Sequence, residues 1–455
     1  MPAPVYRVLR LLCALVEPLP IGTNLGLLHL FWMVLSGQLL GSRGAIFPGL
    51  QAVGLSERAI RRAWVALGQG SWTSRRLVKT WAAVVEAEGL WQPHRYGGYR
   101  PVAVDITAFW RPRLRTCPTQ HYDAAAGQAR PAIVVGLIAR VGSVLGQRFG
   151  LPLGLVRADP ADPSPAAHQR ALLKAVVEQL EADDLAVTDR EFTVALLLAA
   201  GLTAWVTRLR KNFTARRASP PAYRGRGRRP IRGELVRPLA RRYGQRELPA
   251  TPPDQVTQWT EAGRELRAEQ WYDLVVSDAA PGSPTFNVAV ISDPAYTEPL
   301  LVATPLDLSP AVLREVYRDR WPVEQLPLAA KQMLGAARQF VHASETLRQA
   351  QGRLCQRFPE LTLIAGAVLT YAAATSPAVP TGSWDRQPRR TPGRLRRVLA
   401  QAVFPQDYPW PDRIRLKKAV TDHLPKGFWG QRCPAQPTAT TLGSSDPPSP
   451  QAQVA

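Results

Sequence analysis

Cysteine is scarce in this chain, which has four cysteines among its 455 residues. They lie far apart and form no Cys-x-x-Cys pair; they are Cys13, Cys117, Cys355 and Cys433. This spacing predicts neither a zinc site nor a disulfide framework, and it suits the reducing interior of a cell. We therefore expect a cytoplasmic protein.

The sequence also contains few histidines and no nucleotide-binding loop of the common phosphate-binding type. None of the six histidines has the spacing of a metal-binding pair or a serine triad; they are His29, His94, His121, His168, His342 and His423. We interpret each as structural. No Gly-x4-Gly-Lys-Ser/Thr loop occurs in the sequence, so ATP hydrolysis is not indicated.

Long apolar runs are also lacking. The most apolar stretch near the N-terminus, Leu25–Leu40, is interrupted by His29, Ser36 and Gln38. It is shorter than the roughly 20 residues that a membrane span needs, so it predicts a buried helix. The first residues carry two arginines before an apolar stretch, but no clean small-residue cleavage site follows. We expect neither secretion nor a membrane partner.

Positive charge, in contrast, is abundant. Lysine and arginine number 57 against 35 acidic residues, which gives a formal net charge of +22. Such an excess indicates a polyanionic partner, and nucleic acid is the default. A basic membrane-surface protein is the alternative, but no sufficiently long amphipathic basic helix favours it.

The length suggests two or three domains, and the character of the sequence changes along the chain. We expect a helical region at 1–97, the first part of an α/β core at 98–209, a basic and β-rich insertion at 210–284, the second part of the core at 285–376, and a basic, proline-rich tail at 377–455. The composition of the last residues is typical of disorder.

One segment of the helical region resembles a helix-turn-helix DNA-binding element. Gly54 can end one helix, and Ser56 can cap the next. The second helix would carry Arg58, Arg61 and Arg62 beside apolar residues, as a recognition helix does. An ordinary surface helix with a few arginines fits the same residues equally well.

Strands and helices alternate from residue 101 onward. Strands are predicted at Val102–Ile106, Ala132–Val141, Phe149–Val156, Leu185–Asp189, Thr203–Leu209, Phe286–Ile291 and Leu300–Thr304. Helices are predicted at Ala166–Ala182, Phe192–Ala200, from Ser309 to about Ala337, and at Glu360–Ala374 behind Pro359. This order is typical of an α/β fold with a mixed sheet. Small strands are also expected around Trp259 and Trp271, within the insertion.

Three acidic residues stand out by their context. Asp105 and Asp189 each end a predicted strand, and Glu324 lies in the later helical segment. A carboxylate at the end of a buried strand is costly unless it is paired or binds a metal, and α/β sheets place ligand sites at those ends. Three converging carboxylates can hold two Mg²⁺ ions. Alternatively, each acid is a helix cap or a solvated strand end. Asp183 and Asp184 also precede a predicted strand, and we interpret them as turn residues.

The helical segment contains a spaced motif. Tyr317, Arg320, Glu324 and Lys331 have the spacing Y-x2-R-x3-E-x6-K, which matches the YREK signature of DDE transposases of the insertion-sequence-four family. The order of two strand-terminal aspartates, a long basic insertion and a glutamate-bearing helix also resembles that family. The resemblance covers roughly residues 100–345.

Two shorter motifs carry the same resemblance. Asp105-Ile106-Thr107 is similar to the family's first aspartate motif, and Asp189-Arg190-Glu191 to its second. The resemblance implies an RNase H-like catalytic core, with Asp105, Asp189 and Glu324 as catalytic ligands of Mg²⁺, for which Mn²⁺ can substitute. It also implies that Tyr317, Arg320 and Lys331 hold the DNA end near the scissile phosphate.

Helical geometry supports part of this interpretation. Residues spaced three, four and seven apart recur on one side of a helix, as the four motif residues would. A solvated face with charge pairs is the alternative. Pro322 and Pro327 lie inside the segment, and internal prolines kink or break helices.

A second basic cluster lies in the insertion, at Arg224, Arg226, Arg228 and Arg229. We predict that it contacts the DNA backbone, although a solvated loop is the alternative. Together these features predict a DNA transposase that binds double-stranded DNA and acts as a homodimer, because two element ends must be joined. An RNase H-like endonuclease without strand transfer and a non-catalytic, transposase-derived DNA-binding protein remain alternatives.

Overall fold

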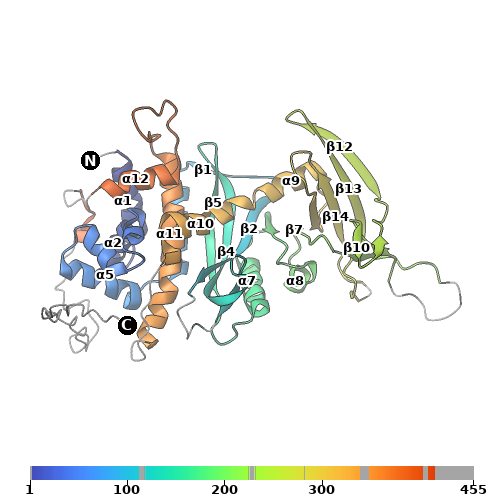
Figure 1. Cartoon of the computed structure of the whole chain (residues 1–455), viewed down its shortest axis with the longest axis horizontal. Helices are drawn as coiled ribbons and strands as arrows, with labels where there is room; N and C mark the ends of the chain where they lie inside the picture. The colour runs from blue at the N-terminus through green and yellow to red at the C-terminus, as the bar shows by residue number, and fades with distance from the viewer. Residues whose placement is uncertain are drawn as a thin grey trace, which may run out of the picture. The chain divides into compact units, whose positions relative to one another are not determined.

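The computed structural model describes residues 3–111, 117, 119–223, 225, 230, 232–280, 282–338, 348–402 and 408–415, and for 348–355 and 415 only the backbone. These residues belong to one compact unit, whose elements are labelled in Figure 1. The arginine cluster predicted at Arg224, Arg226, Arg228 and Arg229 lies outside the described residues.

The chain begins with six helices: α1 (Ala3–Val16), α2 (Thr23–Leu35), α3 (Gln38–Gly41), α4 (Ile46–Ala52), α5 (Glu57–Gln69) and α6 (Ser74–Ala87). Almost every residue of α2 is buried, which explains why this helix is apolar all round. The single helix predicted to reach Leu40 is wrong in extent, because Gly37 takes a left-handed conformation with φ of 75° and separates α2 from α3.

The turn predicted between two helices at Gly54 and Ser56 is present. Gly54 has φ of 78°, and the Ser56 side chain accepts a hydrogen bond from the backbone three residues further on. On α5, Arg58 and Arg61 are exposed, whereas Arg62 is half-buried and burial lowers its pKa. The residues of the predicted recognition helix are therefore helical and largely accessible. Their contact with DNA stays a prediction.

A mixed sheet forms the centre of the fold. It contains β1 (Trp91–Pro93), β2 (Arg100–Trp110), β3 (Gln120–Asp123), β4 (Gln128–Val144), β5 (Gln147–Arg157), β6 (Asp184–Thr188) and β7 (Trp205–Arg208). The central order is β5-β4-β2-β6-β7, with β4 antiparallel to β2 and β5, and with β6 parallel to β2 and β7. The predicted mixed α/β class is thus confirmed. Asp184 is the buried first residue of β6, so its interpretation as a turn residue was wrong.

Helices cover both faces of this sheet (Figure 1). α7 (Pro165–Gln179) and α8 (Val194–Ala199) pack on one face, and α9 (Pro310–Arg318), α10 (Trp321–Leu328) and α11 (Arg348–Thr375) on the other. Side chains alternate between the faces along a strand. On β2, Val102 and Val104 therefore join the core under α7 and α8, whereas Ala103 and Phe109 join the core shared with α10, α11 and the N-terminal helices.

The insertion extends the same sheet. Its strands are β8 (Ala215–Arg217), β9 (Leu235–Val236), β10 (Arg241–Tyr243), β11 (Arg246–Leu248), β12 (Gln255–Glu261) and β13 (Arg264–Val275). β14 (Phe286–Ser292) and β15 (Leu300–Thr304) follow, and the order continues β7-β15-β14-β13-β8-β9. β12 pairs with β13, while β10 and β11 form a separate hairpin.

The long helix predicted from Ser309 to Ala337 is broken. α9 ends at Arg318, α10 begins at Trp321, and a π-helical turn, η1 (Ala329–Met333), and a short 3-10 helix, η2 (Ala336–Arg338), complete the segment. Pro322 lacks the N–H that would continue α9, and its ring would clash with the carbonyl four residues earlier. Pro327 removes a further helical bond just before the π turn, so the one-helix prediction was wrong.

α11 is the long helix of the shared core, and Pro359 lies inside it rather than ahead of it, which corrects the prediction. In the described part of the chain, its segment Gln356–Thr375 is long and apolar enough to cross a membrane, but 89% of its most apolar window is buried in the protein. It packs against α1, α2, α5, β4 and β5. α12 (Pro392–Gln401) and α13 (Asp412–Arg415) follow.

Candidate active site

Asp105 and Asp189, the first two predicted acids, lie level with each other at the end of β6. β2 continues to Trp110, so the prediction that it ends at Asp105 was wrong. However, β6 pairs with β2 only as far as Ala103, which lies opposite Val187. Two residues further on, the same parallel register places Asp105 level with Asp189, just beyond the end of β6. Both carboxylates therefore lie where the pairing between the strands stops.

The third predicted acid reaches this place from α10. Arg320 Nη1 lies 3.7 Å from Asp105 Oδ1, and Arg320 Nη2 forms a hydrogen-bonded ion pair with the Glu324 carboxylate. The Arg320 guanidinium carbon is 5.7 Å from the centre of the Tyr317 ring. Although Tyr317 lies on α9 and Glu324 on α10, the bend between the helices keeps three motif residues together.

Electrostatic interactions join the three acids, and we call Asp105, Asp189 and Glu324 the acid cluster. Burial raises the pKa of Asp105 to about 7; Arg320 opposes the change, and the negative charges of Asp189 and Glu324 add to it. Burial lowers the pKa of Arg320, but Tyr317 and the acid cluster outweigh that effect and raise it, so Arg320 stays charged. The site thus holds more negative charge than its neighbouring arginine neutralises.

Lys331 is held by aromatic rings that the sequence did not single out. Its Nζ lies 5.3 Å from the centre of the Phe109 ring and 5.1 Å from that of Trp110, within the range of cation–π attraction. Burial lowers its pKa to about 8, against the attraction of Asp105. Both rings belong to the part of β2 beyond Asp105. A strand prediction that extended to Trp110 would have included both aromatic residues.

The acid cluster offers only carboxylate oxygens, the ligands that Mg²⁺ prefers. Burial is the main cause of the raised pKa of Asp105, and the charges of Asp189 and Glu324 add to it, so a cation beside this buried carboxylate would favour its charged form. Among the described residues, however, no three metal-binding side chains converge closely enough to hold an ion as they stand. Arg320 bridges Asp105 and Glu324, so the donor set fits Mg²⁺ once this arginine moves aside.

The predicted DNA-binding arginines of α5 lie elsewhere in the fold. α5 packs against α2, α4 and α11 rather than against the strands that carry the aspartates. Arg58, Arg61 and Arg62 are therefore not part of the acid cluster. The structure brings together six of the predicted site residues: Asp105, Asp189, Tyr317, Arg320, Glu324 and Lys331.

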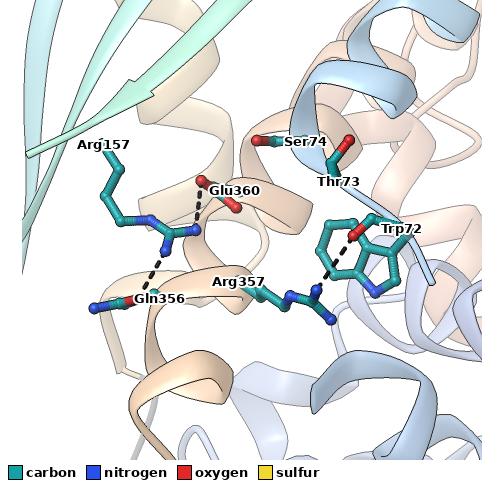
Figure 2. A pocket seen from close by; sticks show the side chains of 7 residues that line it. All are labelled: Trp72, Thr73, Ser74, Arg157, Gln356, Arg357 and Glu360. Carbon is teal, nitrogen blue, oxygen red and sulfur yellow. Dashed lines mark hydrogen bonds and ion pairs between the residues drawn. The ribbon is translucent and has the colours of Figure 1, made fainter. Parts of the chain in front are cut away.

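A cavity of about 350 Å³ lies between α6, β5 and α11, and Figure 2 shows the seven residues that line it: Trp72, Thr73, Ser74, Arg157, Gln356, Arg357 and Glu360. Arg157 pairs with Glu360 at 2.7 Å. Arg357 donates to four backbone carbonyls around the end of α5 and lies over the Trp72 ring. These groups join α11 to the helical region, and no member of the acid cluster lines the cavity.

A comparison with protein families matches residues 112–349 to a family described as the transposase DDE domain. A search of curated proteins finds no match to the chain. The family match covers more than half of the chain and includes Asp189, Glu324 and the other motif residues, which the structure gathers at one site. The chain therefore belongs to the family of proteins with a transposase DDE domain.

Proposed function

We propose that this protein is a DNA transposase of the insertion-sequence-four family, with an RNase H-like core that cleaves DNA at the ends of an insertion sequence and joins them to a target. One observation carries the proposal: Asp105, Asp189 and Glu324 converge where β2 and β6 stop pairing. The family match begins at residue 112, after Asp105. Support for Asp105 therefore comes from the strand register and its electrostatic environment.

The acid cluster would hold the metal ions. Bound there, two Mg²⁺ ions, or Mn²⁺ in their place, would activate the attacking hydroxyl and stabilise the leaving oxygen of the phosphate. Because its pKa is about 7, the Asp105 carboxyl is partly protonated at neutral pH and would release this proton when a cation binds. Asp189 and Glu324 would complete the ligand set.

The YREK residues would bind the DNA end. Arg320 would leave Glu324 and present its planar guanidinium to a phosphate, which it can grip with two hydrogen bonds. Lys331, with a pKa of about 8, is mostly protonated at neutral pH and would act as a point charge held by Phe109 and Trp110. Tyr317 would support Arg320 through their ring contact.

The remaining DNA contacts are proposed from charge and exposure. Arg58, Arg61 and Arg62 on α5 would recognise the terminal repeats, and the arginines at 224–229 and the basic tail would follow phosphates of double-stranded DNA. We also propose a homodimer in the complex that joins two ends, and a cytoplasmic, nucleoid-associated location. The two cysteines whose side chains are described, Cys13 and Cys117, are free thiols, as in a reducing compartment.

One observation favours a second candidate function, a non-catalytic DNA-binding protein. No metal site is preformed among the described residues, because Arg320 holds two of the acids. A protein that had lost catalysis would keep such an ion pair permanently closed. The two candidates differ in whether the chain cuts DNA.

Cleavage of DNA that carries the element's own ends, with Mg²⁺, tests the proposal. We expect the wild type to nick and join this DNA and Glu324→Gln to bind it without cutting. Glu181→Gln is the matched control, because Glu181 is an exposed acid that pairs with arginines at the other end of β6. Cutting by Glu324→Gln would show that another residue is the third ligand. Cutting without joining would indicate an endonuclease, and tight binding without cutting by the wild type would indicate the binding protein.

The role of α5 needs a separate binding measurement. We expect the double variant Arg58→Ala/Arg61→Ala to weaken binding to the terminal repeats and to lower the slope of log K against log salt by about 0.9 for each phosphate that the protein no longer neutralises. Arg170→Ala, at an exposed position of α7, is the control. Equal weakening in both variants would mean that α5 contributes only general charge.

A further inference from the structure

A fully buried carboxylate lies at the bend between α9 and α10. Asp319 has no exposed surface, and its backbone N–H bonds to carbonyls in the last turn of α9. Arg320 is the next residue, and Glu324 follows about one turn later on α10. Asp319 therefore lies at the junction from which α10 begins.

Three side chains from the edge of the sheet hold this carboxylate. The Tyr96 hydroxyl donates to Asp319 Oδ2 at 2.9 Å, and His94 Nδ1 lies 2.6 Å from the same oxygen. Arg148 Nε, on β5, lies 3.1 Å from Oδ1. A charge buried this completely is costly unless it is paired and hydrogen-bonded. Oδ2 has both hydrogen-bond contacts, whereas Oδ1 has the charge of Arg148 beside it but no hydrogen bond among the described residues.

The network continues beyond the histidine. His94 Nε2 lies 2.6 Å from Ser143 Oγ on β4, which fixes the orientation of the ring. The connection of serine, histidine and aspartate resembles a hydrolytic triad. However, Ser143 lies in a strand paired with β1, and Tyr96 and Arg148 also engage the aspartate. Three side chains directed at one carboxylate, with Ser143 behind one of them, indicate that the network positions the backbone.

Packing supports the same conclusion. A Cβ atom at Gly150 of β5 would lie 3.4 Å from the Pro322 carbonyl group, so the first turn of α10 lies directly on β5. Pro322 also prevents α9 from continuing through the bend. The ties from His94, Tyr96 and Arg148 to Asp319 fasten this short break to the edge of the sheet. Arg320, which bridges Asp105 and Glu324, is the next residue along the chain.

We propose that Asp319 is a positioning residue that, through His94, Tyr96 and Arg148, holds the start of α10 so that Arg320 and Glu324 face Asp105. The inference rests on the proposed function, since it concerns the same acid cluster. It adds residues to that function that lie outside the YREK motif. Residues behind a metal ligand typically change metal affinity or activity by about 10–100-fold when they are removed.

The test compares Asp319→Asn with Asp184→Asn in the full chain. Both aspartates are fully buried and paired with arginines, but Asp184 lies at the opposite end of β6. Mn²⁺ binding is measured without DNA, by electron paramagnetic resonance of the free ion, at a temperature where both variants are folded. Nicking rate and DNA affinity are measured on the same samples. Tyr96→Phe and His94→Gln provide milder changes should Asp319→Asn fail to fold.

We expect Asp319→Asn to bind Mn²⁺ at least ~10-fold more weakly and to nick ~10–100-fold more slowly, with little change in DNA affinity. Asp184→Asn should lose stability and keep both properties. A wild-type rate and Mn²⁺ affinity in Asp319→Asn, or equal reductions in Asp184→Asn, would overturn the positioning role alone. A wild type that neither nicks nor binds Mn²⁺ through Glu324 would overturn the proposed function, and this inference with it.

Discussion

The two ends of strand β6 carry charged residues of opposite character. Where β6 begins, Asp184 accepts ion pairs from Arg100 at 3.0 Å and Arg140 at 2.7 Å, and hydrogen bonds from both arginines lower the pKa of Glu181. Where β6 ends, Asp105 and the rest of the acid cluster share one close arginine, Arg320, and the pKa of Asp105 rises to about 7. The same strand therefore has one end with balanced charges and one end with surplus negative charge.

We interpret the balanced end of β6 as structural and the end with surplus charge as functional. Balanced pairs at the start of β6 satisfy the buried Asp184 carboxylate and leave no charge for a ligand. The buried carboxylate of Asp105 at the other end costs the folded chain stability when it is charged, as groups at functional sites often do. Four substitutions test whether the two ends differ in this way.

The largest effect is expected at the acid cluster. Glu324→Gln should reduce Mg²⁺-dependent nicking by more than ~100-fold, because even residues behind a metal ligand contribute about 10–100-fold. The measurement is the single-turnover nicking rate at saturating Mg²⁺. A reduction of less than ~10-fold would show that Glu324 is not a metal ligand. The charge difference between the two ends of β6 would then not correspond to a difference in function.

At the balanced end, Asp184→Asn should lower the free energy of unfolding by about 3–5 kcal/mol, because it leaves Arg100 and Arg140 without their buried partner. Urea unfolding of the full chain measures this change. A change below ~1 kcal/mol, as for an exposed pair, would mean that the cluster is not structurally important.

Asp105→Asn should raise the free energy of unfolding when no divalent cation is present, in contrast to Asp184→Asn. The folded-state pKa of about 7 exceeds the unfolded value of 3.8, so wild-type stability is lost as pH rises between these values. The variant avoids this loss and should gain at most about 4 kcal/mol relative to wild type at pH 8, with a smaller gain at pH 5. Urea unfolding in EDTA at both pH values measures the gain. Destabilisation at pH 8 would contradict surplus charge at this end.

The smallest effect is expected for Glu181→Gln. Glu181 pairs with Arg100 and Arg140, but its side chain is 61% exposed. Exposed pairs contribute about 0–1 kcal/mol, so both the unfolding free energy and the nicking rate should stay close to wild type. A large decrease in nicking would show that the two ends of β6 are coupled, and Glu181 would no longer serve as a control.

Sequence-based prediction succeeded where the evidence was local. The apolar pattern predicted the strands that became β4, β5, β6 and β7, and the mixed sheet is confirmed. The resemblance of their spacing to the YREK signature also grouped Tyr317, Arg320, Glu324 and Lys331, which lie around the acid cluster although their single helix is broken. Boundaries were harder to place, since β2 continues five residues past Asp105 and α11 passes through Pro359.

What the sequence did not predict are contacts between residues far apart in the chain. His94 has no motif around it and was interpreted as structural; its contact with Asp319, 225 residues away, agrees with that interpretation but was not predicted. No periodicity predicts such a contact. Likewise, the bridge that Arg320 forms between Asp105 and Glu324 depends on the packing of α10 against β2, which no local pattern predicts. The binding of Arg320 to DNA stays a prediction.

The sequence by itself determined the basic charge, the α/β order of elements, the choice of acids and the spacing of the YREK residues. These depend on composition and on hydrogen-bonding patterns within a few residues. The tertiary structure decided that Asp105 lies level with Asp189, that Arg320 closes the acid cluster, and that Asp319 anchors α10 to the sheet. Strand register and buried ion pairs join distant segments, and their energy depends on which charges the whole fold brings out of water.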